Sequence, residues 1–195
     1  MDDNGFRILG LAGSLRRASF HRGLVRAARE LAPEGVAVEP YERLDEISFF
    51  NQDVEAEGDP APVTELKEKI RQVDAVLIAT PEYDYAISGV LTNALDWALR
   101  SPSPVRHKPV GIVGASPGGT GTARGQMVLR QILLHAPAYM MPEPQMLIPY
   151  SRQCFDENGD LVDQETRERM ARFLAALVRW TKRFKEPANA YERST

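Results

Sequence analysis

The chain has 195 residues, a length typical of one domain with a full-sized hydrophobic core, and we expect a single domain over residues 1–195. Hydrophobic residues make up 43% and charged residues 26% of the sequence, which excludes the composition of a disordered chain. The formal net charge is only −3. This balance provides no broad basic surface, so we do not expect nucleic-acid binding.

The sequence shows no feature of a secreted or membrane protein. Its one cysteine, Cys154, cannot form an intramolecular disulfide. Residues 1–4, with the sequence MDDN, lack the charged and then apolar pattern of a signal peptide. No apolar run approaches the roughly 20 residues that a membrane-spanning helix needs. We therefore expect a cytoplasmic protein without membrane insertion.

The first third of the chain alternates strand and helix patterns. Residues 8–12 form an apolar run without polar alternation, which is typical of a strand buried on both faces of a parallel sheet. A helical pattern follows at Leu24, Ala27, Ala28 and Leu31. Residues 36–39 are short, half polar and followed by Pro40, which predicts an edge strand. Residues 45–61 are rich in acidic residues, glycine and proline and predict a loop.

The alternation continues to the end of the chain. Apolar runs predict two more buried strands, at residues 75–79 and 110–115. A loop with two prolines is expected over residues 100–108. Apolar residues at helical spacing predict four further helices, near residues 66–73, 91–98, 127–134 and 170–178.

The fifth strand is the least regular of the set. It begins at residues 139–141 and resumes at 146–148, with Pro142 and Pro144 between the two parts. The methionines and tyrosines around it, including Tyr150, suggest an apolar surface for subunit contacts. Five strands alternating with helices predict an α/β flavodoxin-like three-layer sandwich. Its five-stranded parallel sheet would have the order 2-1-3-4-5, with helices on both faces.

The segment between the first strand and the first helix is a candidate phosphate site. In open parallel sheets, ligands bind beyond the carboxyl ends of the central strands. A helix N-terminus offers free N–H groups and a partial positive charge, which Ser14, Arg16 and Ser19 could complete into a cradle for a monophosphate. Alternatively, Ser19 only caps the helix and the arginines are solvated.

Two common nucleotide motifs do not fit this chain. The motif G-x-x-x-x-G-K-[ST] is absent, so nucleoside triphosphatases of that type are excluded. The motif G-x-G-x-x-G is missing after the first strand, which argues against a dinucleotide pyrophosphate there. Residues 119–125 are similar to this motif, but the spacing between their second and third glycines is one residue longer than the motif requires.

The loops after the other two buried strands could border a planar ligand. Residues 80–89 contain Tyr83 and Tyr85, which could stack on a heterocycle, although such tyrosines also pack on protein surfaces. Residues 116–121, with the sequence SPGGTG, contain glycines that would let the backbone approach a flat ring. The alternative for this loop is a flexible turn into the next helix.

Together the three loops resemble the NAD(P)H-dependent FMN reductase family, which includes quinone, chromate and azo-dye reductases. The motifs are G-S-L-R-x-x-S at residues 13–19, P-E-Y-[ND]-Y-x-x-x-G-x-L-x-N-x-x-D-W at 81–97, and S-P-G-G-x-G at 116–121. The resemblance spans about residues 7–180. It implies a flavodoxin-like fold, noncovalent FMN, and NADPH or NADH as cosubstrate.

The resemblance also implies roles for individual residues. Ser14, Arg16 and Ser19 would hold the phosphate of FMN, and Pro81, Glu82, Tyr83 and Asp84 would border the isoalloxazine. Ser116, Gly118 and Gly119 would close the other side of the ring. The second phosphate of NADPH has five candidates, Arg16, Arg17, Arg106, His107 and Lys108.

The chain departs from the family pattern at four positions. His21 stands where Asn is common, and it remains a candidate cofactor-binding residue. Asp84 also stands in place of Asn, and a carboxylate cannot donate the hydrogen bond that an amide would give to a flavin carbonyl. Ala86 and Ser88 replace the usual Ser and Pro.

By resemblance, the expected activity is an NAD(P)H oxidoreductase. Hydride would move from NAD(P)H to the flavin and on to a quinone, free flavin, azo or chromate-type acceptor by a ping-pong mechanism. The flavin carries this chemistry, so no catalytic side chain is expected. No metal site is expected either, because His107 and His135 have no Cys, Asp or His at ligand spacing. Family members are usually dimers or tetramers, and we expect a homodimer or homotetramer.

Two other functions stay open at this point. A flavodoxin-like electron carrier would have no nicotinamide site, but such carriers tend to be strongly acidic and this chain has a net charge of only −3. A flavin-binding regulatory protein without turnover is the third possibility.

Overall fold

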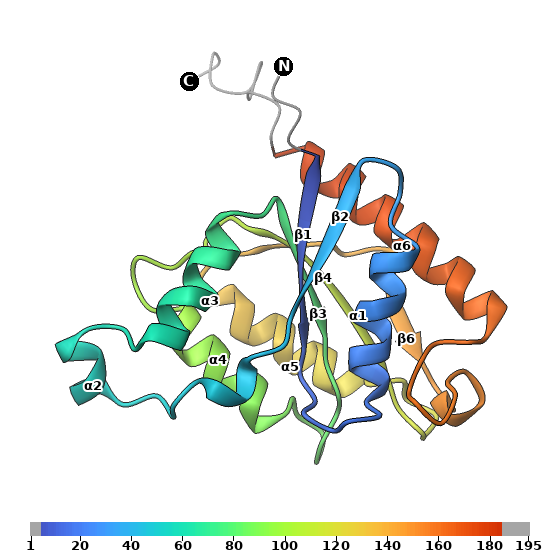
Figure 1. The fold of residues 1–195 in the computed structure, drawn as a ribbon, viewed down its shortest axis with the longest axis horizontal. Helices are drawn as coiled ribbons and strands as arrows, with labels where there is room; N and C mark the ends of the chain where they lie inside the picture. The colour runs from blue at the N-terminus through green and yellow to red at the C-terminus, as the bar shows by residue number, and fades with distance from the viewer. Residues whose placement is uncertain (1–4, 185–195) are drawn as a thin grey trace.

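The computed structural model describes residues 5–184, so the segment in which no signal peptide was expected, residues 1–4, lies outside it (Figure 1). The strands are β1 (Phe6–Ala12), β2 (Val36–Tyr41), β3 (Ala75–Ala79), β4 (Pro109–Ala115), β5 (Tyr139–Met140) and β6 (Met146–Ile148). The helices are α1 (Phe20–Glu30), α2 (Gln52–Glu57), α3 (Ala61–Arg71), α4 (Gly89–Ala98), α5 (Ala123–Leu134) and α6 (Gln164–Lys182). Two 3₁₀ turns are η1 (Leu44–Glu46) and η2 (Ser151–Gln153).

The sheet has the predicted topology. Its strands follow the order β2-β1-β3-β4-β5, every pair is parallel, and β6 also pairs with β4. The flavodoxin-like order 2-1-3-4-5 is therefore confirmed, with β2 at one edge. Successive strands are added on one side of β1 as far as β2 and on its other side from β3 onward, and ligands bind at such a switch point between β1 and β3.

Helices cover both faces of the sheet and make a three-layer sandwich. One core cluster contains residues of α1 and α6, and the other contains residues of α3, α4 and α5. Figure 1 shows these two groups on opposite sides of the strands. Every residue of β3 and β4 is buried, which explains why both strands are uninterrupted apolar runs in the sequence.

The fifth strand position is divided between two short strands. β5 pairs with Pro109 and Val110 at the start of β4, and β6 pairs with residues 113–115 at its end. The predicted apolar surface is wrong for Met141 and Met146, whereas Met140 is half-buried. Met141 and Met146 are each 2% exposed, because both lie in the core cluster beneath α1 and α6.

The segment 45–61 is not the plain loop that its composition predicts, since it contains part of η1 and all of α2. α2 buries no residue, so it has no apolar face that a pattern could reveal. The segment is held by α4, where Trp97 donates its indole N–H to the Ser48 carbonyl over 2.9 Å. The loop over residues 100–108 is confirmed. Within residues 5–184, no helix is long and apolar enough to span a membrane.

Candidate functional site

A cavity of about 280 Å³ lies beyond the carboxyl ends of β1, β3 and β4. Eight predicted site residues line it, namely Ser14, Arg16, Ser19, His21, Pro81, Glu82, Tyr83 and Ser116. Asp84, Gly118 and Gly119 are not among the lining residues. Four lining residues were missed from the sequence, namely Phe20, Ala115, Pro117 and Arg152.

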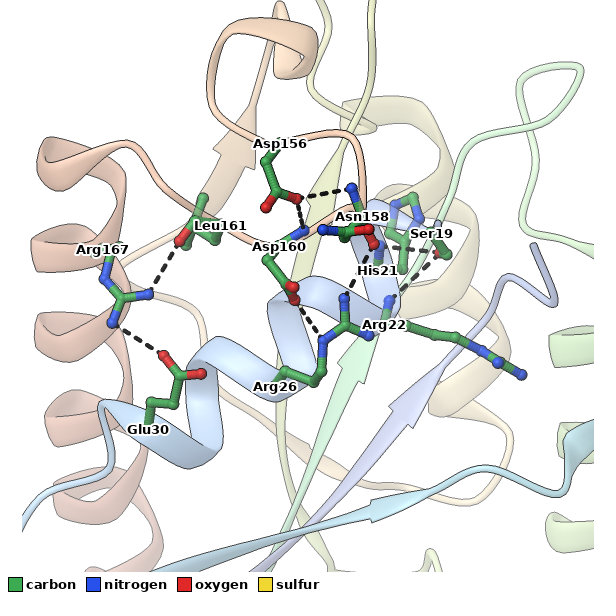
Figure 2. A network of polar contacts seen from close by, with 10 residues as sticks. All are labelled: Ser19, His21, Arg22, Arg26, Glu30, Asp156, Asn158, Asp160, Leu161 and Arg167. Atoms are coloured by element: carbon green, nitrogen blue, oxygen red, sulfur yellow. Dashed lines mark hydrogen bonds and ion pairs between the residues drawn. The ribbon is translucent and has the colours of Figure 1, made fainter. Parts of the chain in front are cut away.

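Ser19 begins α1 and has the capping role that the sequence left open. Its Oγ accepts hydrogen bonds from the backbone N–H groups of His21 and Arg22, over 3.2 and 3.4 Å (Figure 2). A hydroxyl that accepts two hydrogen bonds still has its own proton to donate. Capping and ligand binding are therefore compatible at Ser19, which also lines the cavity.

The first and second loops touch each other at the base of the cavity. A Cβ on Gly13 would lie 2.9 Å from Pro81 Cδ, so only glycine allows this approach. Ser88 caps α4 by accepting from Leu91 N over 3.4 Å and donates its own hydroxyl to the Gly13 carbonyl. The departure from the family pattern at Ser88 therefore supplies a bond between the two loops.

Tyr83 lies between the first loop and a tight turn. Its hydroxyl donates to Ser14 Oγ over 3.3 Å. Its backbone exchanges two hydrogen bonds with Ala86, of 3.0 and 2.9 Å, around the exposed pair Asp84 and Tyr85. Asp84 and Tyr85 have φ of 49° and 66°, the conformation of a type I′ turn, in which Asp is readily accommodated at the first position. The turn therefore explains why Asp is suitable at position 84, and no contact with a ligand is needed to explain it.

The carboxylate of Glu82 faces α5. Its Oε2 accepts from the backbone N–H groups of Arg124 and Gly125, each over 3.0 Å, and its Oε1 is 2.7 Å from the Nε of Arg124. The negative charge thus neutralises the N-terminus of α5. Among residues 5–184, nothing accepts a hydrogen bond from the backbone N–H of Glu82, so this group can donate to a ligand.

The glycines of the third loop have different surroundings. Gly121 has φ of 57°, and a Cβ there would lie 2.7 Å from Ile148 N in β6. Gly118 has open space around its Cα, and its carbonyl accepts from Tyr150 N over 3.1 Å. Of this loop, only Ser116 and Pro117 line the cavity.

His21 is a buried, neutral side chain at the floor of the site. Only 6% of it is exposed, and its Nε2 accepts from the backbone N–H of Ala115 over 3.4 Å. Burial lowers the pKa of His21 to about 4, and the positive charge of Arg16 acts in the same direction. His21 therefore carries no charge for a phosphate at neutral pH.

The positive charge of the cavity comes from two arginines. Arg16 lies in the first loop and donates to the Ala18 carbonyl over 2.6 Å. Arg152 lies in η2, and no local motif marks it in the sequence. Neither guanidinium forms an ion pair within the described part of the chain. Both therefore remain available to an anion.

Three of the predicted contacts to a second NADPH phosphate are displaced from this site. Arg106, His107 and Lys108 precede β4, whereas the cavity lies beyond the end of that strand. Lys108 donates to the Val73 carbonyl over 2.7 Å. The structure thus does not bring these three residues to the cavity, and Arg16 and Arg17 remain on its side of the sheet.

Comparison with known proteins agrees with the geometry. The family model of NADPH-dependent FMN reductase matches residues 6–153. An NAD(P)H-dependent FMN reductase of Pseudomonas aeruginosa is 41% identical over 180 residues, covering 92% of this chain and 97% of the relative. A quinone reductase of Escherichia coli K12 is 37% identical over 182 residues, with coverages of 92% and 97%.

A solved structure shows the same fold. The flavoenzyme NAD(P)H:(acceptor) oxidoreductase FerB of Paracoccus denitrificans superposes with a TM-score of 0.82 at 30% identity. The superposition covers 91% of this chain and 98% of that one. The family match and the identities to full-length reductases establish that this chain belongs to the NADPH-dependent FMN reductase family.

Proposed function

We propose that this protein binds FMN in the cavity above β1, β3 and β4 and uses NAD(P)H to reduce a small acceptor. The observation that carries the proposal is the convergence of the α1 N-terminus with two unpaired guanidiniums on one cavity at the sheet's switch point. These groups fit a phosphate chemically. The adjacent Pro81–Tyr83 segment supplies an apolar and aromatic border for a ring.

Individual residues have distinct roles in this proposal. Ser14, Arg16 and Ser19 hold the phosphate at the positive N-terminus of α1. Pro81, the backbone of Glu82 and Tyr83 border the ring, and Ser116 closes its other side. His21 shapes the floor as a neutral side chain. Asp84, Gly118 and Gly119 lie outside the cavity lining and support the neighbouring turns.

Bound FMN supplies the electron transfer, since it accepts hydride from NAD(P)H and passes two electrons to the acceptor. The protein contributes orientation and electrostatics. The backbone N–H of Glu82 offers a fixed donor to a ring that gains negative charge. Tyr83 is 51% exposed at the border of the cavity, which leaves room for a nicotinamide or an acceptor on an open face.

The acceptor class proposed for this chain is a quinone, free flavin, azo dye or chromate. The Escherichia coli relative is named as a quinone reductase, which favours the quinone. We also propose ping-pong kinetics, because one open ring face would serve NAD(P)H and acceptor in turn. A homodimer or homotetramer and a cytoplasmic location complete the proposal.

Visible absorption spectroscopy tests the central claim. The absorption bands of FMN should shift when FMN binds to the purified protein. Addition of NADPH under anaerobic conditions should then bleach these bands. Failure to bind FMN would refute the proposed site. Binding without bleaching would instead favour a flavodoxin-like carrier.

Steady-state kinetics and solution mass test the finer parts. Parallel double-reciprocal lines with NADPH and a benzoquinone support the ping-pong mechanism, whereas intersecting lines contradict it. A monomeric mass by light scattering would contradict the proposed homo-oligomer.

A further inference from the structure

We propose that Arg152 is a second guanidinium for the flavin phosphate and makes the site select FMN over flavins without a phosphate. This inference rests on the proposed function. Arg152 and Arg16 come from opposite ends of the chain and line the same cavity, together with Ser14 and Ser19. Of the two arginines in the first loop, only Arg16 lines the cavity, and Arg152 enters the site through the fold alone.

The segment that carries Arg152 is attached to the third loop. Backbone hydrogen bonds join Tyr150 N to the Gly118 carbonyl over 3.1 Å and Ser151 N to the Ser116 carbonyl over 3.0 Å. Tyr150 has φ of 49°, and the chain then forms the single 3₁₀ turn η2. These bonds fix the backbone immediately before Arg152 against the wall of the cavity.

The same segment is also attached to the first loop. The ring of Phe155 packs against Phe20, with centroids 4.7 Å apart. The backbone of Gly159 lies so close to the first loop that a Cβ there would be 2.8 Å from the Ala18 carbonyl oxygen. A Cβ on Gly23 of α1 would lie only 1.8 Å from the Gly159 carbonyl oxygen.

Polar contacts extend this attachment along α1. Arg26 donates to Asp160 Oδ1 over 2.5 Å and to the Asn158 carbonyl over 3.5 Å, as Figure 2 shows. Asp156 accepts from the backbone N–H groups of Asn158 and Asp160 and stabilises the turn itself. Arg152 is thus carried by a segment fixed on both sides, which lowers the entropy cost of ordering this segment on a ligand.

The charge balance of the cavity identifies the ligand group. Two guanidiniums and the α1 N-terminus are positive, and the one acidic side chain lining the cavity is Glu82. The Glu82 carboxylate is already occupied by Arg124 and the start of α5. Two like charges without a counterion repel each other, and a phosphate dianion removes that repulsion. We assign Arg152 to the flavin phosphate because it shares the cavity with the first-loop hydroxyls.

Flavin binding to the Arg152→Ala variant tests the assignment. We expect the dissociation constant for FMN to rise about tenfold, because a charge-assisted hydrogen bond is lost. The affinity for riboflavin, which has no phosphate, should stay the same. Arg152→Lys keeps the charge and should recover part of the loss. Arg106→Ala is the matched control, because Arg106 is an exposed arginine at the other end of β4.

Two results would overturn the inference. One is an unchanged FMN affinity, whether or not the preference for NADPH over NADH changes. The other is an equal loss of affinity for FMN and for riboflavin. A wild-type protein that fails to bind FMN would refute the proposed function itself. Wild-type binding with an unaffected Arg152→Ala variant would refute only the role of Arg152. Equal melting temperatures of the two apoproteins show that the variant folds.

Discussion

The two ends of the sheet both carry a cavity lined by arginines, but their charges are satisfied differently. At the amino end, a cavity of about 450 Å³ is lined by residues including Glu55, Arg100 and Arg106. Arg100 bonds to Glu55 over 2.9 Å and lies 4.9 Å from the centroid of the Phe50 ring. At the carboxyl end, the cavity is smaller, about 280 Å³, and its arginines have no acidic partner in the described chain.

Helix direction explains the contrast. α4 and α5 end at the amino-end cavity, where their C-caps Leu99 and His135 are lining residues. Helix C-termini are partially negative and favour cations, so arginines there are stabilised without a ligand. At the carboxyl end, α1 begins with its positive N-terminus and adds to the charge of the arginines. The helix termini beside the arginines, and not the volume of the cavity, therefore mark the candidate site.

The largest expected effect is a pH dependence of the free energy of unfolding, which comes from His21 at the carboxyl end of the sheet. The folded protein keeps His21 neutral down to a pKa of about 4, whereas the unfolded chain takes up a proton near the usual value of about 6.5. Stability should therefore fall as the pH drops from 6.5 to 4, by roughly 3 kcal/mol in total from this group. Urea unfolding of wild type and His21→Asn at pH 7 and pH 5 measures the contribution. Identical pH dependence in His21→Asn and wild type would show that burial of His21 does not couple folding to pH.

A substitution in α1 should destabilise the carboxyl end selectively. Gly23→Ala places a Cβ 1.8 Å from the Gly159 carbonyl oxygen, and the displaced backbone should cost about 2 kcal/mol. Gly89→Ala is the control, because nothing lies within 4 Å of a Cβ at Gly89. Thermal melts should show a lower Tm for Gly23→Ala alone. Equal Tm values would mean that α1 and the turn at Gly159 can move apart without a loss of stability.

Substitution of an arginine should weaken FMN binding at the carboxyl end of the sheet but not at the amino end. Arg16→Ala should weaken FMN binding about tenfold, which corresponds to about 1.4 kcal/mol. Arg106→Ala should leave it unchanged, because Arg106 lies at the amino end. Fluorescence titration with FMN compares the two variants. A comparable loss of FMN affinity in both variants would show that the two ends of the sheet do not differ in FMN binding.

The smallest effect is expected at Asp84. It occupies an exposed turn outside the cavity lining, so Asp84→Asn should change the FMN dissociation constant less than about twofold. The same fluorescence titration detects a larger change. A fivefold gain in affinity would show that an amide at this position reaches the flavin after all.

The sequence by itself determined the layers and the position of the site. Buried parallel strands need apolar side chains on both faces, so the strands at residues 75–79 and 110–115 can be predicted from the sequence. The first loop and the Pro81–Tyr83 segment are contiguous motifs that follow such strands, and the cavity lies where they meet. These features depend on local order along the chain, which a sequence displays directly.

Tertiary structure alone decided which groups line the cavity. Arg152 reaches the cavity because two distant loops hold its segment, and Glu82 turns its carboxylate to α5 because that helix begins beside it. Met141 and Met146 are core residues only because helices cover them. Side-chain direction and charge pairing depend on neighbours far along the chain, so no local pattern could specify them.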